Sequence, residues 1–128
     1  MAVKFLSDEW LSEVESRLNA DEGFQNVAKS QSAKLQQVVT GAPEGDARYG
    51  FIIDGGKISM QRGEIDGAEA TITQDYDTAS KLSKGELQGQ AAFMQGKLKI
   101  TGNLMKMMQL QSAFGAMPKA LTGLDVDY

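Results

Sequence analysis

The sequence predicts an α+β domain in which a five-stranded, mostly antiparallel sheet is covered on one face by helices. Three observations support this class. The chain opens with a helical apolar pattern, its middle alternates apolar and polar residues between turn signals, and helical patterns return after residue 75. Because 128 residues suit one domain that buries roughly two-thirds of its unfolded surface, we expect 1–128 to form a single domain.

The first helix is expected at residues 8 to 20. Ser7 can cap it, and the acidic Asp8 and Glu9 suit the positive end of the helix dipole. Its buried face is formed at helical spacing by Trp10, Leu11, Val14 and Leu18. Residues 22 to 29 are expected to add a turn or two.

A β-hairpin is the clearest element in the middle of the chain, in RYGFIIDGGKISMQRG at residues 48 to 63. Gly55 and Gly56 suit a two-residue turn that requires positive φ. The resulting register pairs Asp54 with Lys57, Ile53 with Ile58, Ile52 with Ser59, and Phe51 with Met60. One face of this hairpin is therefore apolar and is expected to be buried.

The other elements follow from shorter patterns. Strands are expected at residues 33–41, 67–74 and 97–101, and helices at 75–84, 86–95 and 103–114. In the strand at 67–74 the inward residues are expected to be Ala68, Ala70 and Ile72. Asn103 can cap the last helix, and Gly115 and Pro118 are expected to end it.

The composition removes several kinds of chemistry. The chain has no cysteine and no histidine, so disulfides, thiolate catalysis and a Ser-His-Asp triad are excluded. The spacing from Gly50 to Gly55 begins a phosphate-loop pattern, but Gly56 stands where a lysine is needed. No segment is long and apolar enough to span a bilayer, and MAVKFLSDEW lacks the apolar core of a signal peptide. We therefore expect a soluble cytoplasmic protein without metal or cofactor.

The net charge of −4 is distributed unevenly along the chain. Residues 1–77 carry 7 Lys and Arg against 14 Asp and Glu, whereas residues 78–124 carry six lysines and one acid, Glu86. An acidic protein without arginine in its basic half is a poor candidate for binding nucleic acid. The lysines form either a solvated face or a surface that meets lipid headgroups or membranes transiently.

Four acidic residues are the only candidates for catalysis, and none has a catalytic spacing. Asp75 and Asp77 flank Tyr76 and are better explained as an acidic helix start, while Glu64 and Asp66 are typical of a polar turn. We predict that the protein is not an enzyme and has no catalytic residue.

Five methionines occur between residues 94 and 117. On a helical wheel, an arc of about 160° contains Leu104, Met107, Met108, Leu110 and Phe114, and Met117 would extend it. These residues either fill a core against the sheet or line a space for apolar ligands of varying shape, since methionine is unbranched and polarizable. The pattern alone leaves both interpretations open.

The segment QGKLKITGN, followed by a methionine- and leucine-rich helix, resembles the C-terminal signature of the sterol carrier protein-2 domain family of nonspecific lipid-transfer proteins. The resemblance is most specific over residues 75 to 110 and extends more weakly over nearly the whole chain. It implies a hydrophobic tunnel between sheet and helices that binds fatty acids, fatty acyl-CoA, sterols or phospholipids without catalysis. The chain ends in Asp-Val-Asp-Tyr rather than the Ser/Ala-Lys-Leu type of ending found in peroxisomal members.

The resemblance also implies tunnel positions. The residues that match it are Phe51, Ile53, Ile58, Met60, Ile72, Phe93, Leu98, Ile100, Leu104, Met107, Met108 and Leu110. Phe114 and Met117 join this set from the helical wheel. The alternative is an accessory module of a lipid-related pathway, with a closed core and a homodimer or enzyme partner bound through the apolar tail at 119–128.

Overall fold

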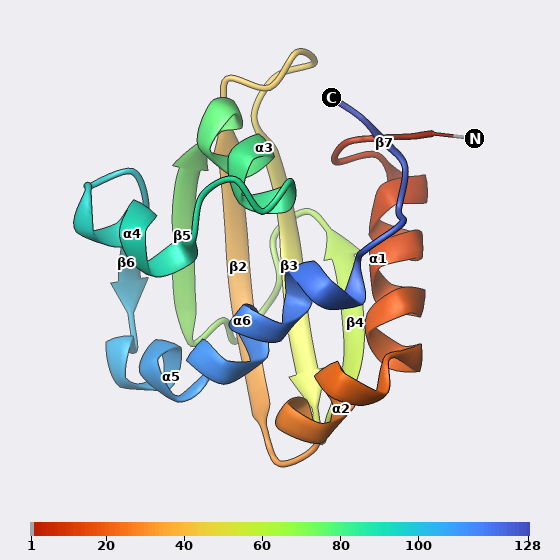
Figure 1. The fold of residues 1–128 in the computed structure, drawn as a ribbon. Helices are drawn as coiled ribbons and strands as arrows, with labels where there is room; N and C mark the ends of the chain where they lie inside the picture. Colours follow the sequence, from red (N-terminus) through yellow and green to blue (C-terminus); the bar gives the residue numbers. More distant parts are fainter. Residues whose placement is uncertain (1) are drawn as a thin grey trace.

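The structure, a computed structural model, describes residues 2–128, apart from the side chains of Gln90 and Pro118. Its main sheet has five strands in the order β4-β3-β2-β5-β6 (Figure 1). The strands are β2 (Ser32–Thr40), β3 (Ala47–Asp54), β4 (Lys57–Arg62), β5 (Ala70–Asp75) and β6 (Lys99–Gly102). Only the β2–β5 pair is parallel, and the other three neighbouring pairs are antiparallel. The predicted α+β class and five-stranded sheet are therefore confirmed.

The hairpin forms in the predicted register, with all four predicted pairs from Asp54–Lys57 to Phe51–Met60. Gly55 and Gly56 have φ of 57° and 93°, which explains why both turn positions are glycine. An ideal Cβ at Gly56 would lie 2.8 Å from the Cα of Lys29, so this glycine also allows the turn to approach α2 closely.

Helices cover the front of the sheet and its β4 edge (Figure 1). Their bounds are α1 Asp8–Ala20, α2 Glu22–Ala28, α3 Tyr76–Ser83, α4 Gly89–Met94, α5 Leu104–Gln109 and α6 Gln111–Ala120. The first helix has the predicted bounds, and the Ser7 side chain caps it by accepting a hydrogen bond from the backbone N–H of Trp10 at 3.1 Å. In Figure 1, α3 crosses the upper part of the front face and α6 the lower part, while α4 and α5 flank β6.

The prediction of one helix at 103–114 is wrong, because the chain bends at Leu110 between α5 and α6. The N–H of Leu110 donates to the carbonyl oxygens of Lys106 at 3.1 Å and Met107 at 3.2 Å, which ends α5. Gly115 and Pro118 do not end the helix, since α6 continues to Ala120. The bend directs α6 across the sheet to pack on α2, and Leu110 becomes fully buried.

The strand predicted at 67–74 begins later, at Ala70. Ala70 and Ile72 face the core as predicted, but Ala68 precedes the strand and is exposed. The backbone N–H of Glu69 bonds to the carbonyl oxygen of Lys34 at 2.7 Å just before the ladder begins. Residues 63–69 are needed as a connection, because the chain must cross the back of the sheet from the edge strand β4 to β5 (Figure 1).

Gly50 and Gln36 hold this crossing connection to the back of the sheet. The Gln36 side chain accepts from the N–H of Ile65 at 2.8 Å and donates to the carbonyl oxygen of Gly63 at 3.0 Å. The Ile65 side chain lies over Gly50, where a Cβ would overlap it. The centre of the back face is therefore covered by the 63–69 connection rather than by a helix.

The two ends of the chain meet in a second, two-stranded sheet. Strands β1 (Val3–Lys4) and β7 (Val126–Asp127) pair in parallel, and the Tyr128 ring lies 4.8 Å from that of Phe5. The apolar tail that the sequence offered as an assembly surface is thus paired within the chain.

Candidate functional site

The predicted lipid-binding residues occupy three different environments in the structure. Five of them lie in the closed core, with at most 6% of their surface exposed: Phe51, Ile53, Ile58, Ile72 and Leu110. They come from the three strands β3, β4 and β5 and from the α5–α6 bend. These residues have the packing of an ordinary hydrophobic core.

A second group is half-buried and packs against that core. It consists of Met60, Leu98, Ile100, Met107, Phe114 and Met117. The Phe114 ring on α6 lies 6.1 Å from that of Phe51, so α6 rests on β3 through an aromatic contact. Three of the six are methionines, whose flexible side chains can change shape at small energetic cost. This group forms the boundary between the core and the surface.

The third group is exposed. Phe93, Leu104 and Met108 have 46%, 50% and 69% of their surface accessible, and their neighbours Met94 and Met105 have 78% and 70%. We call these five residues the apolar rim. They lie on α4 and α5, the two short helices that flank the edge strand β6 (Figure 1). The site prediction omitted Met94 and Met105, although both belong to the methionine cluster that the sequence indicated.

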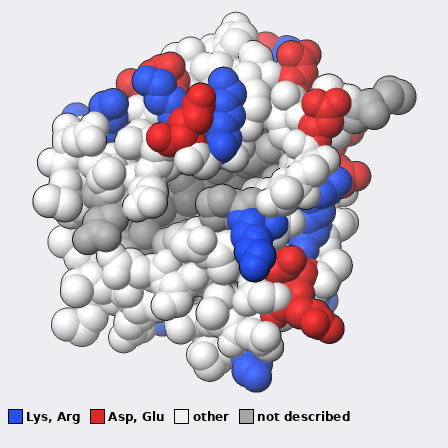
Figure 2. All heavy atoms as spheres, in the orientation of Figure 1, with Lys and Arg blue, Asp and Glu red and all other residues white. Residues whose placement is uncertain are grey.

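The front face is hollowed between α3 and α6 (Figure 2). On β2 and β5 alternate side chains point toward the front face, because alternate residues of a strand face the same way. Those positions include two buried glutamines, Gln37 and Gln74, which the sequence analysis did not single out. Below the hollow, Figure 2 shows mainly uncharged surface.

Two other cavities lie away from this face. A shallow one of about 480 Å³ lies on the back of the sheet beside the 63–69 connection, and includes Lys34, Ile52 and Glu69. Another of about 420 Å³ lies between the chain ends and the 42–47 loop. Of the predicted tunnel residues, Ile53 alone lines either of these two cavities.

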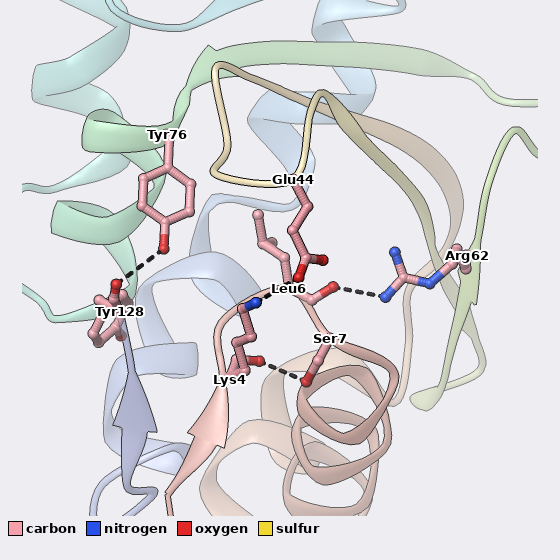
Figure 3. A network of polar contacts seen from close by, with 7 residues as sticks. All are labelled: Lys4, Leu6, Ser7, Glu44, Arg62, Tyr76 and Tyr128. Carbon is pink, nitrogen blue, oxygen red and sulfur yellow. Dashed lines mark hydrogen bonds and ion pairs between the residues drawn. The ribbon is translucent and has the colours of Figure 1, made fainter.

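Polar contacts hold the cleft between the chain ends in place (Figure 3). Lys4 pairs with Glu44 at 2.6 Å, which raises the pKa of the lysine and lowers that of the carboxyl group. Arg62 donates to the carbonyl oxygen of Leu6 at 2.7 Å, and the Tyr76 hydroxyl lies 3.4 Å from the carbonyl oxygen of Tyr128. These charged groups are therefore already satisfied by partners within the chain.

Two of the four acidic residues that the sequence offered for catalysis, Asp75 and Asp77, have structural partners. Asp75 caps α3 by accepting from the N–H of Thr78 at 2.7 Å, and this hydrogen bond lowers the pKa of its carboxyl group. Asp77 pairs with Lys81 at 3.1 Å. Within residues 2–128, the structure holds no group of three or more acidic side chains that could bind a metal ion.

The fold is that of a small α+β domain whose exposed apolar rim lies on the two short helices α4 and α5. The family model for the SCP-2 sterol transfer family matches residues 11–115. Human sterol carrier protein 2 is 35% identical over 100 residues, which cover 78% of this chain. The chain therefore belongs to the SCP-2 sterol transfer family. The match covers only 18% of the human protein's length.

Solved structures agree with this fold. A crystal structure of sterol carrier protein 2 superposes with a TM-score of 0.80 at 19% identity, covering 94% of this chain and 99% of the other. A conserved hypothetical protein of Thermus thermophilus, described as possibly a sterol carrier protein, superposes with a TM-score of 0.81 at 18% identity. The match covers 98% of this chain and 93% of the other. Palmitated SCP2L2 from Aedes aegypti superposes with a TM-score of 0.66 at 18% identity, covering 89% of this chain and 95% of the other.

Within the described range, 2–128, no helix combines the length and apolar character that crossing a membrane requires. Family membership associates the chain with lipid binding and transfer.

Proposed function

We propose that the protein carries an apolar lipid, without chemical change, between α6 and the front face of the sheet. The observation that carries this proposal is the gradation from a closed core at Leu110, through the half-buried methionines, to the exposed apolar rim. Large exposed apolar patches are uncommon on monomeric proteins and mark binding surfaces. Movement of Met107, Phe114 and Met117 away from the sheet would make room for a hydrocarbon.

The ligand class is a long hydrocarbon chain or sterol, as in fatty acids, fatty acyl-CoA, sterols or phospholipids. Burial of its apolar surface would supply about 25 cal/mol per Å². The palmitate described for the Aedes aegypti relative supports a long acyl chain as one such ligand. Because methionine side chains adapt to different shapes, we expect breadth in chain length rather than strict selection.

The apolar rim would take up lipid from an anionic membrane surface. The segment 93–108 contains the whole rim, three lysines and no acidic residue. Lys97 and Lys99 are exposed, whereas Lys106 lies 3.6 Å from Glu69. Apolar side chains interleaved with lysines suit an interface with anionic headgroups, where each lysine contributes about 1 kcal/mol.

Vesicle binding tests whether the apolar rim docks on an anionic membrane. Sedimentation with phosphatidylcholine vesicles, with or without phosphatidylglycerol, is expected to show binding that requires the anionic lipid. Replacing Met94, Met105 and Met108 together by serine should abolish that binding, while the control Gln109→Ser, at an exposed position of α5, should not. Equal sedimentation of both variants with the wild type would contradict docking through the rim.

A second candidate function is an accessory module that binds a protein rather than a lipid. The complete burial of Leu110 and the tight packing around Phe51 favour this candidate, because they describe a filled interior. In that case the rim would be covered by an enzyme partner or a second copy of the chain. Native mass spectrometry separates the two candidates, since a carrier retains co-purified lipid and an accessory module is found as a lipid-free assembly.

A further inference from the structure

The three most exposed members of the apolar rim are all methionines. Met94 on α4 is 78% exposed, and Met105 and Met108 on α5 are 70% and 69% exposed. Met105 and Met108 are three residues apart on one helix, so their side chains lie on the same side of it. Oxidation turns the flexible apolar side chain of methionine into a polar sulfoxide. These positions therefore carry a chemistry that leucine or phenylalanine would not supply.

The other methionines that the structure describes provide an internal comparison. Met60 on β4, Met107 on α5 and Met117 on α6 are half-buried and pack against the hydrophobic core. An oxidant dissolved in water meets the sulfur atoms of the rim directly, whereas core atoms cover part of each of these three side chains. The rim methionines are therefore expected to react first.

No thiol in the chain competes for an oxidant. The sequence has no cysteine, so methionine is its only sulfur-containing side chain. The single tryptophan, Trp10, is only 6% exposed, and the rings of Phe5 and Tyr49 lie 5.0 Å and 5.7 Å from its own. An oxidant in solution thus reaches the rim methionines more easily than these other reactive groups.

Oxidation would change the polarity of the rim without changing its charge. Only Phe93 and Leu104 would stay apolar, because the other three of the five rim residues are the methionines. A sulfoxide oxygen loses its hydrogen bonds to water when it enters an apolar layer, which is unfavourable. Lys97 and Lys99 are exposed and would keep their attraction for anionic headgroups. Any loss of membrane contact would therefore come from the apolar side chains alone.

The space for the carried lipid would be spared by the same reaction. The space that we assign to the hydrocarbon opens at Met107, Phe114 and Met117, which are half-buried and are not members of the rim. Oxidation limited to the rim should thus affect membrane docking and leave lipid binding in solution unchanged.

We propose that Met94, Met105 and Met108 form a redox-sensitive modification site, at which hydrogen peroxide releases the protein from the membrane. Each thioether sulfur attacks one peroxide oxygen, and the O–O bond breaks. The other oxygen leaves as hydroxide and takes the proton from the new S–OH group, so the products are methionine sulfoxide and water. Each sulfur loses two electrons to the peroxide. The release from membranes rests on the proposed docking of the rim, whereas the site of oxidation does not.

Peptide mass spectrometry of the full chain during peroxide treatment tests the modification site. Fragment ions distinguish Met107 from its neighbour Met108, so each position can be followed in time. We expect the three rim methionines to oxidise as fast as they do in the urea-unfolded chain. The three half-buried methionines should oxidise several times more slowly than they do in the unfolded chain. Equal protection of the two groups would overturn the modification site.

Sedimentation with vesicles of phosphatidylcholine and phosphatidylglycerol tests the release, with peroxide removed by catalase once three oxygen atoms have been added. Each sulfoxide should weaken binding by about tenfold, so the oxidised protein should stay in solution. Binding of a fluorescent fatty acid in the absence of vesicles should not change. Methionine sulfoxide reductases with dithiothreitol, which becomes a disulfide as the sulfoxide oxygen leaves as water, should restore sedimentation.

Each variant is compared with itself before and after peroxide, so that any effect of a substitution on docking cancels. Replacing Met94, Met105 and Met108 together by leucine should remove the sensitivity to peroxide, whereas the control Met60→Leu should keep it. The release is overturned if oxidation of the rim leaves wild-type sedimentation unchanged, or if the leucine variant loses sedimentation as the wild type does. If the unoxidised wild type does not sediment, docking and release both fail, while the fluorescent fatty acid still decides the carrier function.

Discussion

Comparing Leu110→Ala with Met107→Ala distinguishes a residue of the closed core from a residue that contacts the ligand. The two positions are only three residues apart. Leu110 is fully buried at the bend between α5 and α6, whereas Met107 is half-buried one turn earlier. Truncating a fully buried leucine removes its packing and leaves a cavity, so we expect Leu110→Ala to lower the free energy of unfolding by about 2–5 kcal/mol. For Met107→Ala we expect a loss of about 1 kcal/mol or less.

These differences are large enough to measure by thermal unfolding. For 128 residues the entropy of unfolding is about 0.27 kcal/mol per kelvin, so a loss of 3 kcal/mol lowers Tm by about 11 °C. Met107→Ala should move Tm by about 4 °C or less on the same scale. Circular dichroism at increasing temperature, supported by urea titration at constant m, gives both values.

Ligand binding should respond in the opposite order. If the Met107 side chain contributes about 40 Å² of contact to the hydrocarbon, its removal should weaken lipid binding by about fivefold. Leu110→Ala, measured well below its Tm, should change binding less than it changes stability. The reasoning is refuted if Met107→Ala costs as much stability as Leu110→Ala and leaves lipid binding unchanged, because Met107 would then be a core residue.

Two further predictions concern the frame that holds the site. Asp75→Ala should lower the free energy of unfolding, measured with urea at pH 7, by about 1 kcal/mol because the α3 cap is lost. Asp75→Asn should retain most of the stability that the cap contributes, since asparagine also caps helices. Because the pKa of Asp75 is lowered in the fold, its charge contributes stability above about pH 4, and the difference between wild type and Asp75→Asn should shrink as pH falls through the folded pKa. Gly50→Ala should destabilise by about 1–3 kcal/mol, since the new Cβ would overlap Ile65, and adding Ile65→Ala should restore part of the loss. A Gly50→Ala protein as stable as the wild type would show that the 63–69 connection can move freely away from the sheet.

Local sequence patterns were sufficient wherever neighbouring residues decide the conformation. The cap at Ser7, the turn at Gly55 and Gly56, and the register of the hairpin were all predicted correctly, because capping and tight-turn geometry depend on a few adjacent residues. The family signature that includes residues 95–103 likewise implied the fold class that the structure confirms.

Long-range packing decided the rest. No local signal marks Leu110 as the place where the last helix bends, since the bend exists to bring α6 onto α2 and the sheet. Helical periodicity predicts an apolar arc but does not show which of its residues are covered by another element. Leu104 and Leu110 both belong to that arc, yet Leu104 is 50% exposed and Leu110 is fully buried. In the same way, Gln36 and Gln37 are adjacent and identical in type. Only the sheet and its crossing connection decide that Gln36 bonds to the 63–69 connection on the back of the sheet, whereas Gln37 accepts from Gln74 on the front.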